Sequence, residues 1–117
     1  VPDMATARDE TAAAVLDGKL WVTGGRGSRS HMVEVFDPAS NTWDATKAAM
    51  TTARGSHALA VLDGELHAVG GYRYGYQTAV EKYDPRADSW SAVPGMAMPE
   101  GRTWNAAAVL MICLLMI

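Results

Sequence analysis

Residues 6–25 read TARDETAAAVLDGKLWVTGG, and residues 52–71 repeat this text as TARGSHALAVLDGELHAVGG. A second matching pair follows, EVFDPASNTW from Glu34 and EKYDPRADSW from Glu81. The first pair lies 46 residues apart and the second 47, so the intervening loop has gained one residue, as repeat proteins tolerate. The sequence therefore predicts an array of similar units.

This repeat divides the chain into four parts. Residues 8–53 form the first repeat and residues 54–101 the second, while residues 1–7 are a terminal strand or linker, or the end of a preceding unit. Residues 102–117 start a third repeat and then continue into the apolar tail MICLLMI, which replaces the expected Asp-Gly turn and second strand. That ending indicates a piece of a longer protein or a truncated gene product.

Each repeat is predicted to supply four short β-strands. The segments are short, rich in Val, Leu, Trp and Tyr, and none keeps the apolar spacing of a helix. Two-residue Asp-Gly loops favour type I′ hairpins, and Asp-Pro ends the third strand of each repeat. The expected strands are residues 12–16, 19–23, 32–36 and from Trp43 in the first repeat, and 58–62, 65–69, 79–83 and from Trp90 in the second.

Composition excludes several classes of protein. With 49% hydrophobic and 20% charged residues, the 117-residue chain is built to pack, and its length is below that of an average domain. A net charge of -3 gives no basic footprint for nucleic acid. Cys113 is the only cysteine, so neither an internal disulfide nor a cysteine zinc cluster forms within the chain.

The sequence shows neither a signal peptide nor a segment long enough to span a membrane. The start VPDMATARDE has neither a basic region nor an apolar core, so no signal peptide is visible. The apolar run AAAVLMICLLMI is shorter than the roughly 20 residues that cross a bilayer. We therefore expect no membrane partner and a cytoplasmic location.

The repeated residues resemble the Kelch repeat. They are Arg8, Gly24-Gly25, Glu34-Val-Phe-Asp-Pro and Trp43, then Arg54, Gly70-Gly71, Glu81-Lys-Tyr-Asp-Pro and Trp90. The resemblance runs from about Met4 to Leu110 and implies an all-β, partial Kelch β-propeller, with two four-stranded antiparallel blades and the first strand of a third. Because a propeller needs about four to eight blades to close, two blades imply that the remaining blades, or other copies, complete the ring.

The resemblance also assigns packing residues. It places the aromatic residues Phe36, Tyr83, Trp43 and Trp90 between blades, which agrees with their repeated strand positions. The Gly pairs are not a phosphate cradle, because no G-x-G-x-x-G pattern opens a helix here.

In Kelch propellers that bind peptides, the Arg before the innermost strand and the residues after the Gly pair line one mouth of the channel. Several guanidinium groups at one axis would suit an acidic peptide or a phosphate. The alternative for each Arg is an anchoring salt bridge, for instance with Asp9, Glu10 or Glu100. Carried onto this chain, the resemblance singles out Arg8, Arg54, Arg102, Arg26 and Tyr72.

Two neighbouring features extend this candidate site. The loop at residues 72–77, Tyr-Arg-Tyr-Gly-Tyr-Gln, has the composition of an interaction surface, so Tyr74 is a partner-binding candidate unless the tyrosines cap the blade edge. His57 lies close to Arg54 and is a further candidate, whereas His31 and His67 are not spaced like a metal pair. No catalytic residue, metal or cofactor is expected.

Three functions remain in view. The resemblance favours a non-enzymatic protein–protein interaction module that binds an acidic or phosphorylated segment, including the substrate-receptor role of BTB-Kelch ubiquitin-ligase adaptors, although no BTB domain is present. The alternative is a fragment of a Kelch-type enzyme such as a sialic acid mutarotase, with Arg54 and His57 at a sugar pocket. A copper enzyme would need a Tyr–Cys cross-link, and Cys113 lies in the apolar tail. A third hypothesis is a fragment without function alone that associates through its open sheet faces.

Overall fold

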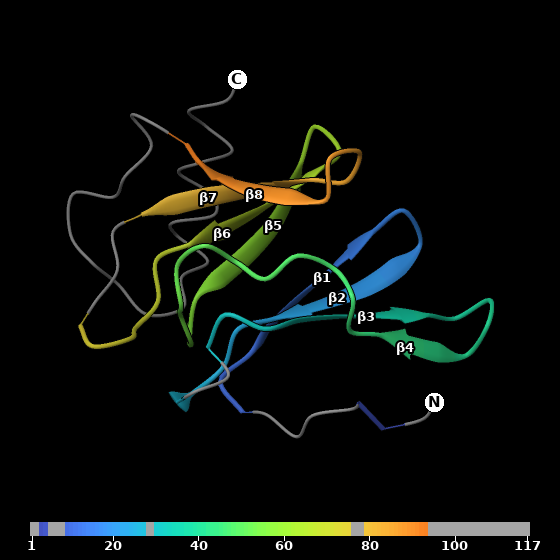
Figure 1. Ribbon diagram of the computed structural model, residues 1–117, viewed down its shortest axis with the longest axis horizontal. Coiled ribbons are helices and arrows are strands. Elements are labelled where there is room, and N and C mark those ends of the chain that lie inside the picture. Colours follow the sequence, from blue (N-terminus) through green and yellow to red (C-terminus); the bar gives the residue numbers. More distant parts are fainter. Residues whose placement is uncertain (1–2, 5–8, 28–29, 76–78, 94–117) are drawn as a thin grey trace.

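The computed structural model describes residues 3–4, 9–27, 30–75 and 79–93, which form two four-stranded antiparallel sheets (Figure 1). The strand orders are β1-β2-β3-β4 and β5-β6-β7-β8. The two predicted four-stranded units are therefore confirmed, whereas the expected third repeat, residues 102–117, lies outside the described residues. The strands are β1 (Ala12–Leu16), β2 (Lys19–Thr23), β3 (Val33–Asp37), β4 (Thr42–Asp44), β5 (Ala58–Leu62), β6 (Glu65–Val69), β7 (Val80–Asp84) and β8 (Ser89–Ala92).

The first hairpin of each sheet turns through the predicted Asp-Gly pair. Asp17 and Gly18 have φ values of 52° and 73°, and Asp63 and Gly64 have 51° and 76°. Positive φ at both central residues is the type I′ geometry, whose twist matches that of the flanking strands. The two hairpins are thus alike in loop length and in conformation.

The third strand of each sheet begins and ends one residue later than predicted. Met32 and Ala79 lie just outside β3 and β7, and each accepts a hydrogen bond from the first glycine of a Gly pair, at 2.8 and 3.2 Å. At the other end Asp37 and Asp84 are still paired, with Thr42 and Ser89. The Asp side chains then stabilise the turns, because each Oδ1 accepts a main-chain N–H two residues ahead at 2.9 Å.

The main hydrophobic core lies between the two sheets. Trp21 of β2 packs against Tyr83 of β7 with ring centroids 4.9 Å apart, and Tyr83 packs on Trp90 of β8 at 5.3 Å. Such aromatic pairs add to the stabilisation from buried area. The buried members of this core are Leu16, Trp21, Val33, Val35, Met50, Leu66, Ala68, Tyr83 and Trp90.

The four aromatic residues predicted to pack differ in their surroundings. Tyr83, Trp90 and Phe36 are buried, as expected, but Trp43 is only half-buried. Phe36 and Trp43 pack on each other at 5.3 Å. In the second repeat the equivalent residues contact what precedes them: Tyr83 packs on Trp21 of the first sheet, and Trp90 bonds to Ala48 of the segment between the sheets. In the described residues no sheet precedes β1.

The segment between the sheets, residues 45–53, is anchored to both. Ala48 donates its N–H to Asp88 at 3.0 Å and accepts the indole N–H of Trp90 at 2.9 Å. The N–H of Met50 donates in the other direction, to the carbonyl of His31 in the first repeat, at 3.0 Å. The sheets are therefore joined by directional bonds as well as by the core.

The two ends of the sheets differ (Figure 1). The hairpin end carries the Asp-Gly turns and the turns that follow Asp37 and Asp84. The loop end carries residues 9–10, just before β1, and residues 24–27, 54–57 and 70–75, which belong to the longer connections between strands. Within the described part of the chain, no helix is long and apolar enough to cross a membrane.

Candidate functional site

The Gly pairs allow the loops to approach one another closely. A Cβ on Gly24 would lie 2.3 Å from the carbonyl oxygen of Arg54 and 2.5 Å from Cε1 of His57. A Cβ on Gly71 would lie 2.7 Å from the carbonyl oxygen of Gly55. These distances are shorter than atoms can tolerate, and Gly24 also has a φ of 70°. Gly24 therefore lets the first repeat contact the segment just before β5, and Gly71 lets the loop after β6 approach the same segment.

Replacing Gly24 with alanine is expected to lower the free energy of unfolding by about 2 kcal/mol or more, because the new methyl group meets main chain and must move it. Urea denaturation followed by tryptophan fluorescence measures this change.

Gly18→Ala is the matched control. Gly18 has a similar φ of 73°, but nothing lies within 4 Å of the position of its Cβ. It should cost only the left-handed strain of alanine, about 1 kcal/mol. Equal losses of unfolding free energy in the two variants would show that the close approach at Gly24 does not contribute to stability.

Main-chain hydrogen bonds bind the loops into one surface. Gly55 and Tyr72 exchange two bonds, at 3.0 and 2.9 Å, and the N–H of Gly25 donates to the carbonyl of Arg54 at 3.2 Å. The N–H of Ser56 donates to the carbonyl of Glu10 at 2.8 Å. These bonds hold the loops of both repeats side by side at the loop end.

A cavity of about 430 Å³ opens between these loops, and its polar and aromatic lining comes from both repeats. Three predicted residues, Arg26, Tyr72 and Tyr74, lie together on its wall; that they bind a partner stays a prediction. We call this space the loop-end cavity. It is lined by Glu10, Arg26, Gly27, Tyr72, Arg73 and Tyr74.

The side chains at the cavity are strongly exposed. Tyr74 is 88% exposed and Tyr72 51%. The Arg73 guanidinium lies 4.1 Å from the centroid of the Tyr74 ring and donates to its hydroxyl at 2.7 Å. Arg26 forms an exposed ion pair with Asp9. The cavity thus combines two cations with aromatic faces, next to the acid Glu10.

Tyr74 is held in a conformation unusual for a tyrosine. Its φ is 57°, a region that costs a side-chain-bearing residue roughly 1 kcal/mol or more. A bond from the N–H of Arg73 to the carbonyl of Gly75, at 3.0 Å, closes the loop around it. Strain at an exposed aromatic residue points to a role outside the packing of the sheets.

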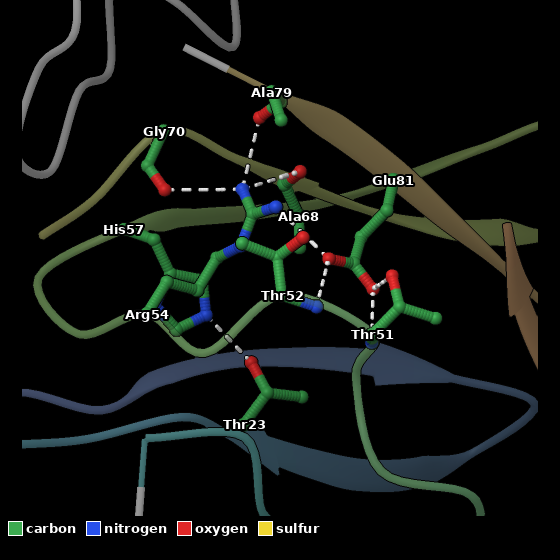
Figure 2. A network of polar contacts seen from close by, with 9 residues as sticks. All are labelled: Thr23, Thr51, Thr52, Arg54, His57, Ala68, Gly70, Ala79 and Glu81. Atoms are coloured by element: carbon green, nitrogen blue, oxygen red, sulfur yellow. Dashed lines mark hydrogen bonds and ion pairs between the residues drawn. The ribbon is translucent and has the colours of Figure 1, made fainter. Parts of the chain in front are cut away.

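Arg54 does not line the loop-end cavity and is 0% exposed. Figure 2 shows the polar contacts that surround it. Its Nη2 donates to Oε2 of Glu81 at 2.9 Å, and Glu81 is itself only 2% exposed. Burial lowers the pKa of Arg54, and the charge of Glu81 opposes that shift. The Nη1 atom donates to the carbonyls of Ala68 (3.2 Å), Gly70 (3.0 Å) and Ala79 (2.9 Å).

The Glu81 carboxylate also ties down the segment between the sheets (Figure 2). Its Oε1 accepts the main-chain N–H of Thr51 at 2.8 Å and the Thr51 hydroxyl at 3.2 Å, and its Oε2 accepts the N–H of Thr52 at 3.1 Å. This geometry favours the anchoring alternative for Arg54.

His57 belongs to the same buried network and not to the cavity wall. It is 3% exposed, and its Nε2 is 2.8 Å from the hydroxyl of Thr23 in the first repeat. Burial, and next the charge of Arg54, lower the pKa of His57 to about 3. His57 is therefore neutral and joins the two repeats. The other predicted cations, Arg8 and Arg102, lie outside the described residues.

Two features of this region were not predicted from the sequence, namely two residues of the cavity and the ion-pair partner of Arg54. Arg73 lies in the loop predicted as an interaction surface but was not singled out, and Glu10, which also lines the cavity, was considered only as an anchor for an arginine. The anchor of Arg54 is Glu81, whereas Asp9, one of the proposed anchors, pairs with Arg26. A signal existed, because both repeats carry the Arg and the Glu at matching positions, Arg8 with Glu34 and Arg54 with Glu81.

Comparison with known families agrees with the two sheets. The model of the Kelch motif matches residues 7–45 and 53–97, which include all eight strands. The chain belongs to the Kelch-repeat family. Each four-stranded sheet of this Kelch chain is accordingly one propeller blade.

The Kelch chain is also similar to curated proteins of Arabidopsis thaliana. It is 35% identical to F-box/kelch-repeat protein At4g39580 over 111 residues, which are 93% of the chain and 28% of the relative. It is 31% identical to F-box/kelch-repeat protein At4g39560 over 94 residues, 79% of the chain and 34% of the relative. The chain thus spans about a third or less of these relatives.

A solved structure shares the arrangement of the blades. The structure of YjhT superposes with a TM-score of 0.73 at 25% sequence identity, covering 88% of the Kelch chain and 32% of YjhT. Among the described residues of the Kelch chain, no group of three or more His, Cys, Asp or Glu side chains is placed to hold a metal ion.

Proposed function

We propose that this chain is the protein-binding part of a Kelch-repeat protein, and that a segment of the partner lies in the loop-end cavity. The observation that carries the proposal is the joint lining by Tyr72, Arg73 and Tyr74 of one repeat and Arg26 of the other. Tyrosine and arginine are the side chains that most often dominate protein interfaces. A binding surface shared by two blades also explains why the loops are bonded together.

The charges of the cavity support an acidic or phosphorylated segment as the ligand. Arg73 and Arg26 offer guanidinium groups, which bind carboxylate and phosphate in a two-pronged geometry. Arg26 already holds the carboxylate of Asp9 on the surface, so an incoming anion would take the place of Asp9. Glu10 also lines the cavity, and its carboxylate would repel an anion placed beside it. This repulsion would orient the bound segment.

The names of the relatives support an extension of this proposal. They join an F-box to kelch repeats, and the chain matches only part of their length. We include in the proposal that the chain serves as the substrate receptor of a ubiquitin-ligase adaptor in the cytoplasm. Further blades of the same propeller are then its neighbours.

The enzyme alternative would use Arg54, His57 and Glu81 at a sugar pocket. These side chains do converge, but each is at most 3% exposed and engaged in internal hydrogen bonds. The network therefore supports a structural role, and the observations favour the protein-binding proposal.

Replacing Arg73 with methionine tests the proposal. The probe is a capped Glu-phosphoSer-Gly-Glu peptide, titrated into the 117-residue chain by calorimetry. We expect the dissociation constant to rise about fivefold, because a partly exposed guanidinium–phosphate pair contributes up to about 1 kcal/mol. Methionine keeps an unbranched apolar stem and removes the guanidinium group with its charge and its hydrogen-bond donors.

Arg86→Met is the matched control, because Arg86 lies in the turn after Asp84 at the hairpin end. It should leave binding unchanged. Equal losses in the two variants would show non-specific attraction, and no binding by the unmodified chain would overturn the proposal.

A further inference from the structure

A second cavity opens at the hairpin end, on the side of the molecule opposite the loop-end cavity. Its volume is about 310 Å³, and it lies between the two sheets. Four buried side chains form its floor, Leu16, Trp21 and Val35 of the first sheet and Tyr83 of the second. This hairpin-end cavity is separate from the proposed binding surface.

The floor is aromatic and contains a polar atom without a partner. Trp21 and Tyr83 lie 4.9 Å apart. Trp21 is 5% exposed, and among the described residues its indole N–H has no hydrogen-bond partner. The nitrogen atom is itself covered by the protein, so what Trp21 offers to an occupant is its ring and not its N–H. Indole and phenol rings also attract cations to their faces.

The rim of the cavity carries three carboxylates and two ammonium groups. Asp44 keeps its charge, because hydrogen bonds from Thr46, and then the nearby Lys47 and Lys19, lower its pKa. Both lysines of the rim therefore act on Asp44. Asp17 and Asp37 form no ion pair within the described residues, and their carboxylates are available to a cation.

We propose that the hairpin-end cavity binds a lysine or arginine side chain from a basic segment of a partner protein. The apolar stem of that side chain lies on Trp21 and Tyr83, and the cationic head reaches Asp17 and Asp37. The cavity holds one long side chain, and its carboxylates repel nucleic acid. The protein would thus bind an acidic segment at the loop-end cavity and a basic segment at the hairpin-end cavity.

The double variant Asp17→Asn, Asp37→Asn tests this site in the 117-residue chain. Both changes preserve the fold, because Asn-Gly is preferred in a type I′ turn and an asparagine oxygen can still accept the N–H of Ala39. The probe is a capped Gly-Ala-Lys-Ala-Gly peptide, followed by the NMR signal of the Trp21 indole N–H, which Trp21→Phe assigns. We expect the double variant to bind on the order of tenfold more weakly.

The second repeat supplies a matched control. Asp63→Asn with Asp84→Asn makes the same two changes at the equivalent turn positions, which do not line this cavity. This variant should bind as the unmodified chain does, and a norleucine version of the peptide should bind far more weakly than the lysine version. Equal losses in the two double variants, equal binding of the two peptides, or no shift of the Trp21 signal would each overturn the proposal.

Discussion

Replacing Glu81 with glutamine is expected to lower the free energy of unfolding by about 3 kcal/mol or more. The Arg54 guanidinium is fully buried, and Glu81 is its only anionic partner among the described residues. Glutamine leaves that cation without a counter-charge and offers one acceptor oxygen where two now serve Thr51, Thr52 and Arg54. The midpoint of urea denaturation should fall accordingly.

Glu65→Gln is the control for this experiment. Glu65 pairs with Lys82 at 3.6 Å on the same sheet, but both side chains are partly exposed, at 28% and 40%. Water screens such a pair, and its loss should cost less than about 1 kcal/mol. If Glu81→Gln costs no more than Glu65→Gln, the buried network does not stabilise the fold.

Acid should destabilise the protein through His57. The folded protein holds the pKa of His57 at about 3, against 6.5 for an ordinary histidine. Between these values the unfolded chain binds a proton that the folded chain does not, so stability falls as the pH falls. The loss attributable to His57 is about 2 to 3 kcal/mol between pH 6 and pH 4. A protonated ring would also carry an N–H at Nδ1, where no acceptor lies among the described residues.

His57→Gln isolates this contribution, because glutamine does not titrate and its amide can still bond to the hydroxyl of Thr23. Urea denaturation of both proteins across this range gives the difference, in which carboxylates common to both cancel. The slope should be shallower in the variant. An NMR titration of the His57 ring provides a second measurement, and protonation near pH 6 in the folded protein would contradict the prediction.

Much of the fold could be predicted from the sequence because the repeat displays each turn twice. The Asp-Gly turns fix the loop length of the hairpins, and with it the register of β1 with β2 and of β5 with β6. The start of β3 was harder to predict from the sequence. Met32 accepts a hydrogen bond from Gly24 although it lies outside the strand, and that bond depends on the conformation of the Gly pair.

The candidate site was predictable in part. Arg26 and Tyr72 follow Gly pairs, and their position after a strand places them at the loop end. Whether an arginine faces a cavity or the protein interior depends on partners distant in the chain. Arg54 lies 27 residues from Glu81, and the pairing of β5 through β7 brings them together. Composition and spacing do not reveal that Arg54 is buried.

The segment between the sheets has a consequence for how the protein folds. Thr51 and Thr52 donate their amide hydrogens to Glu81 in the second sheet, whereas Met50 donates to the carbonyl of His31 in the first repeat, and Arg54, just after the segment, donates to that of Ser30. Neighbouring amides of one short segment are therefore protected by opposite blades. If either blade opens, this segment loses half of its hydrogen bonds and no longer holds the other blade. The two blades are therefore expected to unfold as one cooperative unit, with amide hydrogens that exchange together.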